Sequence, residues 1–207
     1  GLAFALFNGL PLPGEIANDG KNALDLGKDP EALEAFRIQM VLNKLQSEGL
    51  RLKDMPEEYF VWPRQESRSN VLIASCAVFC LNRLLDEHRF EECAAGIDEM
   101  LADDLSRLPG MYRKLLVNDR IYLHLLNGES ETAISLMDKE QKQFMKAMKG
   151  QLPIHRTDYA YALLAEKDAA KAEKALAAFD KMAKHYPHEQ EIASERELMA
   201  LARERAA

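Results

Sequence analysis

Apolar residues recur at helical spacing through nearly the whole chain after residue 28. The first helix is predicted to begin at Asp29-Pro30, because Asp is a favoured N-cap and Pro is favoured at the first helical position. Four apolar residues follow at helical intervals, namely Leu33, Phe36, Met40 and Leu45. Gly49 is predicted to end this helix, since glycine readily adopts the left-handed conformation that closes helices.

Three pairs of apolar helical faces follow, and a short polar turn separates the two members of each pair. The turns are expected at 86–89, at Asn127-Gly128 and at Lys167-Asp168, and Pro109 and Pro153 lie between one pair and the next. One further helix is expected after Pro187. The pattern predicts antiparallel helical hairpins and no strands.

A small residue occupies the same place in the second helix of each pair, shortly after the turn. These residues are Cys93, Ala133 and Ala172, which lie about 40 residues apart. A small side chain there lets the two helices of a hairpin approach closely. The period and this residue resemble tetratricopeptide-type repeats, so we expect an all-α fold in which hairpins of 69–207 stack as a right-handed array. The full repeat consensus is absent, and a plain helical bundle remains the alternative.

The chain before this array divides into two parts. Residues 1–27 contain five of the ten glycines and two of the eight prolines, and they are predicted to form an irregular apolar segment. Such a segment exposes apolar surface when alone, so we expect it to pack against material outside this chain and the chain to be a piece of a longer protein. Residues 28–68 are predicted to form a connecting helix and an ordered loop.

Composition limits the classes of function that the chain can have. The chain has 207 residues and a formal net charge of −7, which argues against a general affinity for nucleic acid. Three cysteines do not make a disulfide framework and suit a reducing compartment. No apolar run reaches the roughly 18–20 residues of a membrane-spanning helix.

Side chains able to bind metal or act in catalysis are sparse and scattered. Cys76, Cys80 and Cys93 fit apolar helix faces, so we interpret them as core residues rather than as an incomplete thiolate site. His185 and His188 flank a helix-ending proline and are expected at a solvated helix end. The sequence shows no Ser/His/Asp arrangement, glycine-rich phosphate loop or His-Glu-x-x-His motif, which argues against a soluble hydrolase.

One segment carries a more specific pattern. Asn8-Gly-Leu-Pro-Leu-Pro13 is followed by Asn18-Asp19-Gly20, and this arrangement resembles the last signature of the site-2 protease family, the intramembrane zinc metallopeptidases. The similarity continues through Asn22-Ala-Leu24, Lys28-Asp-Pro30 and the stretch from Gly49 to Phe60, which resemble family members with a C-terminal helical extension.

The resemblance implies a function for individual residues. In that family the Asp of the Asp-Gly pair is the third zinc ligand, after two histidines of a His-Glu-x-x-His helix, and the fourth position holds the water that attacks the peptide. By position, Asp19 would be this ligand in the intact protease, with Asn8 and Gly20 supporting the turn. The histidines and the catalytic glutamate are missing here, so no zinc, no cofactor and no catalytic residue are expected in this fragment by itself. An ordinary Asp-Gly turn is the alternative interpretation.

Together these patterns predict the C-terminal, cytosolic helical-repeat region of a membrane-bound zinc metalloprotease. Residues 1–27 would be the remnant of the catalytic core, and the membrane would be reached through the missing N-terminal part. The repeat surface is expected to bind a protein or peptide partner. The alternative is a free-standing cytosolic helical-repeat scaffold without catalytic activity.

Overall fold

The computed structural model describes residues 29–104, 108 and 110–206, and this part of the chain contains helices and no strand. An all-α fold is therefore confirmed. The α-helices are α3 (Pro30–Ser47), α4 (Val71–Asp86), α5 (Phe90–Ala102), α6 (Gly110–Leu126), α7 (Ser130–Leu136), α8 (Lys139–Ala147), α9 (Leu152–Leu164), α10 (Ala169–Ala183) and α11 (Glu189–Ala206). Three 3₁₀ turns lie between α3 and α4, namely η1 (Leu52–Asp54), η2 (Glu57–Tyr59) and η3 (Gln65–Ser67).

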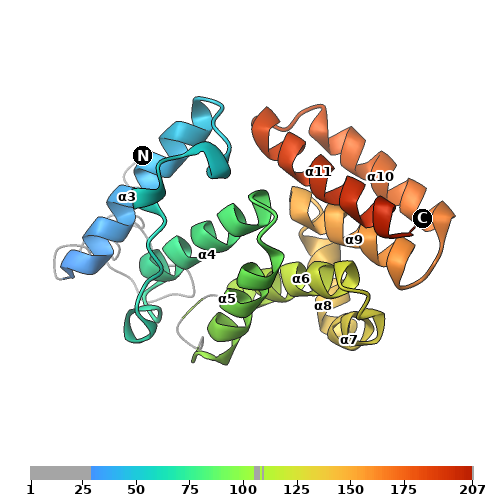
Figure 1. Cartoon of the computed structure of the whole chain (residues 1–207), viewed down its shortest axis with the longest axis horizontal. Helices are drawn as coiled ribbons and strands as arrows, with labels where there is room; N and C mark the ends of the chain where they lie inside the picture. Colours follow the sequence, from blue (N-terminus) through green and yellow to red (C-terminus); the bar gives the residue numbers. More distant parts are fainter. Residues whose placement is uncertain (1–28, 105–107, 109, 207) are drawn as a thin grey trace, which may run out of the picture.

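Helices that are neighbours in sequence pack side by side from α3 to α7 and again from α9 to α10, while α9 and α11 both also pack on α6. The result is an arch (Figure 1). Helices α3 and α4 form one arm, α9 to α11 form the other, and α5 to α8 connect them. The C-terminal helix α11 lies on the side of its arm that faces α4.

The apolar core is divided along the arch. A large cluster joins α4, α5 and α6 to parts of α7 to α9 and to α11, around fully buried residues such as Ile97, Met100 and Ile121. A second cluster around Phe179 joins α9, α10 and α11, and a small third one joins α3 to α4. The three small residues Cys93, Ala133 and Ala172 are all buried, as close approach of the helices requires.

Local sequence signals define the helix ends as predicted. The Asp29 carboxylate accepts hydrogen bonds from the backbone N–H groups of Glu31 and Ala32, so it caps α3. Gly49 follows α3 with a φ of +90°, and Gly128 has a φ of +77° in the turn between α6 and α7. The loop from 50 to 68 is ordered by its three 3₁₀ turns.

Two features of the helices differ from the sequence prediction. In α3 the predicted apolar positions Leu33, Phe36 and Met40 are 54%, 37% and 48% exposed, whereas Ala32 and Leu42 are fully buried. Helix α3 contacts its neighbour through the face that carries alanines, because the small side chains let it approach α4.

The second difference lies in the hairpin that follows α6. In the sequence, apolar residues at helical spacing run from Ala133 and Ile134 to Met148 and predict one helix with both residues facing inward, but the segment is broken between α7 and α8. Asp138 starts a new helix there, since its carboxylate accepts a hydrogen bond from the backbone N–H of Gln141 at 2.7 Å. Ala133 is buried, but Ile134 is 48% exposed.

Candidate ligand-binding pocket inside the arch

The structure does not test the metal ligand and the supporting residues predicted from the sequence. Asn8, Asp19 and Gly20 lie outside the described residues. Cys76, Cys80 and Cys93 are buried core residues, as predicted. His185 and His188 lie on either side of Pro187, between α10 and α11. No group of three His, Cys, Asp or Glu side chains within the described ranges is arranged to hold a metal ion.

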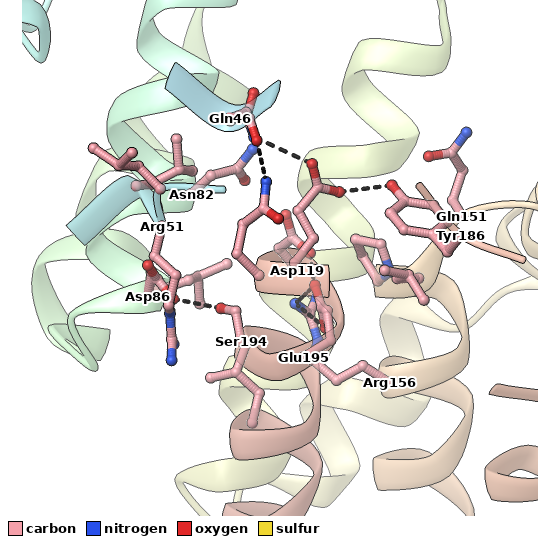
Figure 2. Close-up of a pocket in the computed structure, with 18 residues that line it drawn as sticks. Gln46, Arg51, Asn82, Asp86, Asp119, Gln151, Arg156, Tyr186, Ser194 and Glu195 are labelled. Carbon is pink, nitrogen blue, oxygen red and sulfur yellow. Dashed lines mark hydrogen bonds and ion pairs between the residues drawn. The ribbon is translucent and has the colours of Figure 1, made fainter. Parts of the chain in front are cut away.

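A pocket of about 230 Å³ lies between the two arms of the arch instead (Figure 2). Its wall is built by the end of α3 and the following loop, the last turn of α4, the middle of α6, the first turns of α9 and the first half of α11. Residues far apart in the sequence therefore converge on it. The charged residues of the wall are Arg51, Asp86, Asp119, Arg156, Glu191 and Glu195.

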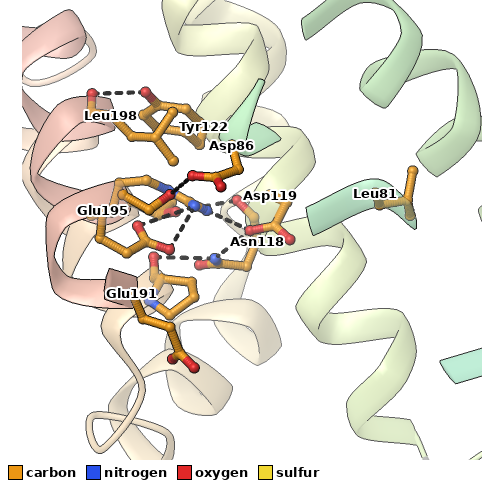
Figure 3. Close-up of polar contacts among 12 residues, drawn as sticks. Leu81, Asp86, Asn118, Asp119, Tyr122, Glu191, Glu195 and Leu198 are labelled. Atoms are coloured by element: carbon orange, nitrogen blue, oxygen red, sulfur yellow. Dashed lines mark hydrogen bonds and ion pairs between the residues drawn. The ribbon is translucent and has the colours of Figure 1, made fainter. Parts of the chain in front are cut away.

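A buried guanidinium lies at the centre of the wall. Arg156 of α9 is 1% exposed, and it pairs with Asp119 of α6 and with Glu195 of α11, the latter at 3.2 Å between Nη1 and Oε1 (Figure 3). Its guanidinium carbon lies 4.5 Å from the centre of the Tyr122 ring, a cation–π distance. The Tyr122 hydroxyl donates to the Leu198 carbonyl at 2.8 Å. Arg156 thus links three helices through charge and aromatic contact.

Glu195 has an unusual electrostatic environment. Burial raises its pKa to about 7; Arg156 opposes this rise, while the negative charges of Asp119 and Glu191 add to it. Its side chain is 12% exposed. A single guanidinium shared between two carboxylates does not fully compensate both, so Glu195 holds a proton more readily than an ordinary glutamate does.

A second arginine links the two arms. Arg51, after α3, pairs with Asp86 of α4 and with Glu197 of α11, each at 2.6 Å. Asp86 also accepts hydrogen bonds from the Ser194 hydroxyl at 2.5 Å and from the backbone N–H of Lys53 at 3.0 Å. Burial alone raises the pKa of Asp86, but these hydrogen bonds outweigh burial and leave it below the ordinary value.

Amide side chains complete the link between the arms. Gln190 donates to the Gln46 carbonyl at 2.5 Å, and the Gln46 amide donates to Glu191 at 3.2 Å. The Tyr186 hydroxyl donates to the other Glu191 oxygen at 2.6 Å. Residues 46–53 and α11 therefore meet through hydrogen bonds and ion pairs, which we call the polar clasp.

Some polar groups of the wall have no hydrogen bond within the described part of the chain. The Nε–H of Arg156 is buried and finds no acceptor there. The side-chain amides of Asn82, half-buried on α4, and of Gln151, exposed before α9, lie on the wall, and neither has a hydrogen-bond partner among the described residues. These donors and acceptors are available to a bound molecule.

Within the described residues the wall is polar, because it carries arginines, carboxylates, side-chain amides and the hydroxyls of Ser194 and Tyr186. Its hydroxyl nucleophile candidate, Ser194, donates to Asp86, a carboxylate already held in its charged form by Arg51 and therefore a poor base. The arrangement is that of a small polar binding pocket.

The sequence prediction did not include this pocket. The sequence contains no clear signal for it, because Asp119 and Arg156 stand beside other charged residues, such as Arg120 and Asp158, and helical periodicity does not single them out. The sequence alone does not show that these two residues, with Glu195, would meet.

Comparisons with known proteins give no family for the chain: a scan of protein-family models, a search of curated proteins and a search of solved structures each found no match. Among the helices of the described ranges, none combines the length and apolar character of a membrane span.

Proposed function

We propose that the chain is a protein-interaction domain, in which tetratricopeptide-like helical hairpins form an arch and the pocket inside it receives a segment of a partner protein. The observation that carries this proposal is the convergence of five separate parts of the chain on one pocket with free polar groups. Helical arrays bind extended segments on such inner surfaces. The register of Cys93, Ala133 and Ala172, all buried after their turns, supports the repeat interpretation.

We further propose that this domain is the C-terminal, cytosol-facing region of a membrane-bound zinc metallopeptidase of the site-2 protease type. The support is the resemblance of residues 1–60 to that family, including the Asp-Gly pair at Asp19-Gly20. Asp19 would supply one carboxylate of the zinc site, and the parent protein would supply the two imidazoles. One carboxylate is not a zinc site, so this chain alone is expected to be inactive. In the parent, the domain would position substrates or an adaptor.

The second candidate is a free-standing scaffold with the same binding pocket and no link to proteolysis. The gene sequence upstream of residue 1 distinguishes the two. Apolar spans and a His-Glu-x-x-His motif in the same reading frame would support the protease, whereas a start codon at or near residue 1 would refute it. In an intact protease, removal of 69–207 is expected to change substrate choice or rate.

The interaction itself is testable with a random peptide library displayed on phage and selected against the immobilised chain. Selected peptides should bind the wild-type protein and lose at least about tenfold in affinity with Gln151→Trp, which places a large side chain at the pocket wall. Gln151 is exposed and its side chain bonds to nothing in the described residues, so the variant should fold. Asn82→Trp provides a second block from the opposite arm.

The matched control is Glu173→Trp, on the exposed outer side of α10. Thermal unfolding of each variant checks that the fold is intact. Peptides that bind the wild type and both pocket variants equally would refute the pocket as the binding site, and a library that yields no binding peptide would refute the interaction function.

A further inference from the structure

The pocket wall has more negative than positive charge. Four carboxylates line it, and two guanidiniums face them. Each guanidinium is shared: Arg51 binds Asp86 and also Glu197 beyond the wall, while Arg156 binds Asp119 and Glu195. Each guanidinium is therefore already paired with two carboxylates, and an anionic ligand would have to break existing ion pairs.

Two carboxylates on the wall have capacity for a further positive charge. Glu191 accepts hydrogen bonds from Tyr186 and Gln46, which are neutral groups, and no cation of the described ranges forms an ion pair with it. Glu195 and Asp119 share the Arg156 guanidinium. The Arg156–Glu195 distances are 3.2 Å, longer than the 2.6 Å distances from Arg51 to its two carboxylates. A cation placed between Glu191 and Glu195 would relieve repulsion that the fold leaves uncompensated.

A second, independent feature shows what else the ligand must carry. The Arg156 side chain is 1% exposed and lies on the pocket wall, yet its Nε–H has no acceptor in the described structure (Figure 2). A buried donor without a partner costs about 1–3 kcal/mol, and a bound acceptor would recover this energy. A peptide carbonyl is such an acceptor, and a simple metal ion is not.

The size of the pocket limits the ligand further. Its volume of about 230 Å³ is below the range of roughly 300–1,000 Å³ in which proteins bind cofactors and drug-sized molecules. It suits one side chain and the adjoining backbone. The free amides of Asn82 and Gln151 can hydrogen-bond that backbone from both arms.

We propose that the pocket binds a single basic residue, lysine or arginine, of a partner peptide. The cationic head group lies between Glu191 and Glu195, and a peptide carbonyl of the ligand accepts the Arg156 Nε–H. This inference rests on the proposed interaction function and names the residue class that the function recognises.

The test uses four capped pentapeptides, acetyl-Ala-Ala-X-Ala-Ala-amide, in which X is lysine, arginine, norleucine or glutamate. Two-dimensional ¹H–¹⁵N NMR follows the side-chain signals of Gln151, Asn82 and the Arg156 Nε–H during titration. The lysine and arginine peptides should shift all three signals. The norleucine peptide, which keeps the chain length and loses the charge, should bind at least about fivefold more weakly, and the glutamate peptide more weakly still.

A charge-removing variant locates the interaction. Glu191→Gln keeps a carbonyl acceptor for the Gln46 amide, places an N–H beside the Tyr186 hydroxyl oxygen, which can accept it, and removes the charge. It should weaken binding of the lysine peptide about three- to tenfold and leave binding of the norleucine peptide unchanged. The matched control is Glu204→Gln, on an exposed position of the same helix. Equal binding of the lysine and norleucine peptides, or an unchanged lysine affinity in Glu191→Gln, would overturn the proposal.

The outcome is separable from that of the interaction function. If library selection yields peptides that depend on Gln151 but are not enriched in lysine or arginine, the preference for a basic residue is wrong and the interaction function stands. If no peptide is selected at all, the interaction function itself fails.

Discussion

The clearest test of the electrostatics concerns Glu195, because its one positive neighbour, Arg156, favours the ionised form, while burial and two negative neighbours, Asp119 and Glu191, disfavour it. Glu195→Gln keeps the shape of the side chain and one carbonyl acceptor for Arg156, and it removes the ability to ionise. If burial and the charges of Asp119 and Glu191 dominate, the ionised form of Glu195 is the unfavourable one. If the ion pair with Arg156 dominates, the ionised form is the favourable one.

The magnitude follows from the pKa. A glutamate whose pKa rises from 4.5 to about 7 on folding corresponds to about 3 kcal/mol of stability. Because the folded pKa is the higher one, this contribution is fully present below pH 4.5 and is lost as the pH rises through 7. The glutamine variant has no such loss. The free energy of unfolding of Glu195→Gln, relative to wild type, should therefore increase by about 2–3 kcal/mol between pH 5 and pH 8.

The assay is urea unfolding followed by circular dichroism at pH 5, 6, 7 and 8, with Glu204→Gln as the exposed control. The control should show a difference from wild type that changes by less than about 0.5 kcal/mol over this range. If the glutamine variant becomes less stable relative to wild type as the pH rises, then the ion pair with Arg156 outweighs burial and the reasoning is refuted.

Three further predictions test other parts of the fold. Gly96→Ala should lower the free energy of unfolding by about 1–3 kcal/mol in a denaturant titration, because a Cβ there would lie 2.7 Å from Leu81 Cδ2. The control Gly110→Ala has open space around it and should not lower this free energy. Equal free energies of unfolding for the two variants would contradict close packing at Gly96. Arg51→Met should lower the free energy of unfolding by about 3 kcal/mol, since it leaves the buried Asp86 without its cation. It should also increase the rate of amide hydrogen exchange in the first half of α11, and an unchanged rate there would argue against the polar clasp. Cys80 should react slowly with a thiol reagent at pH 8 in the native protein and rapidly after unfolding, because burial raises the pKa of its thiol to about 12. A rapid reaction of Cys80 in the native protein would refute its burial.

Helix boundaries could be predicted from the sequence because their causes are local. A cap such as Asp29 needs only the next few backbone N–H groups, and glycines such as Gly49 and Gly128 need only their own φ angles. The small residue after each turn is also a nearby signal, and Cys93, Ala133 and Ala172 are all buried.

The parts that failed depend on the neighbour that a helix meets. In α3, apolar periodicity favoured Leu33, Phe36 and Met40, yet the cluster shared with α4 contains Ala32 and Ala35 instead. The break at Asp138 reflects competition between a continuing helix and a side-chain cap, and periodicity does not register such competition. The pocket requires five parts of the chain to meet, which no local pattern encodes.

The charges inside the arch are not explained by stability alone. Replacing a buried ion pair by apolar side chains of similar volume is often neutral or stabilising, so Arg156 with Asp119 and Glu195 is a costly way to join three helices. Apolar clusters already join α6 with α9, and α9 with α11. The polar clasp adds hydrogen bonds and ion pairs between residues 46–53 and α11. The pocket wall thus carries one of the two fully buried guanidiniums of the described residues, and the other, Arg68, pairs with Asp103 and Glu99 away from the pocket. The proposed binding role would account for the charges on the wall, because a recognition surface needs fixed charges and directed donors that an apolar core cannot provide.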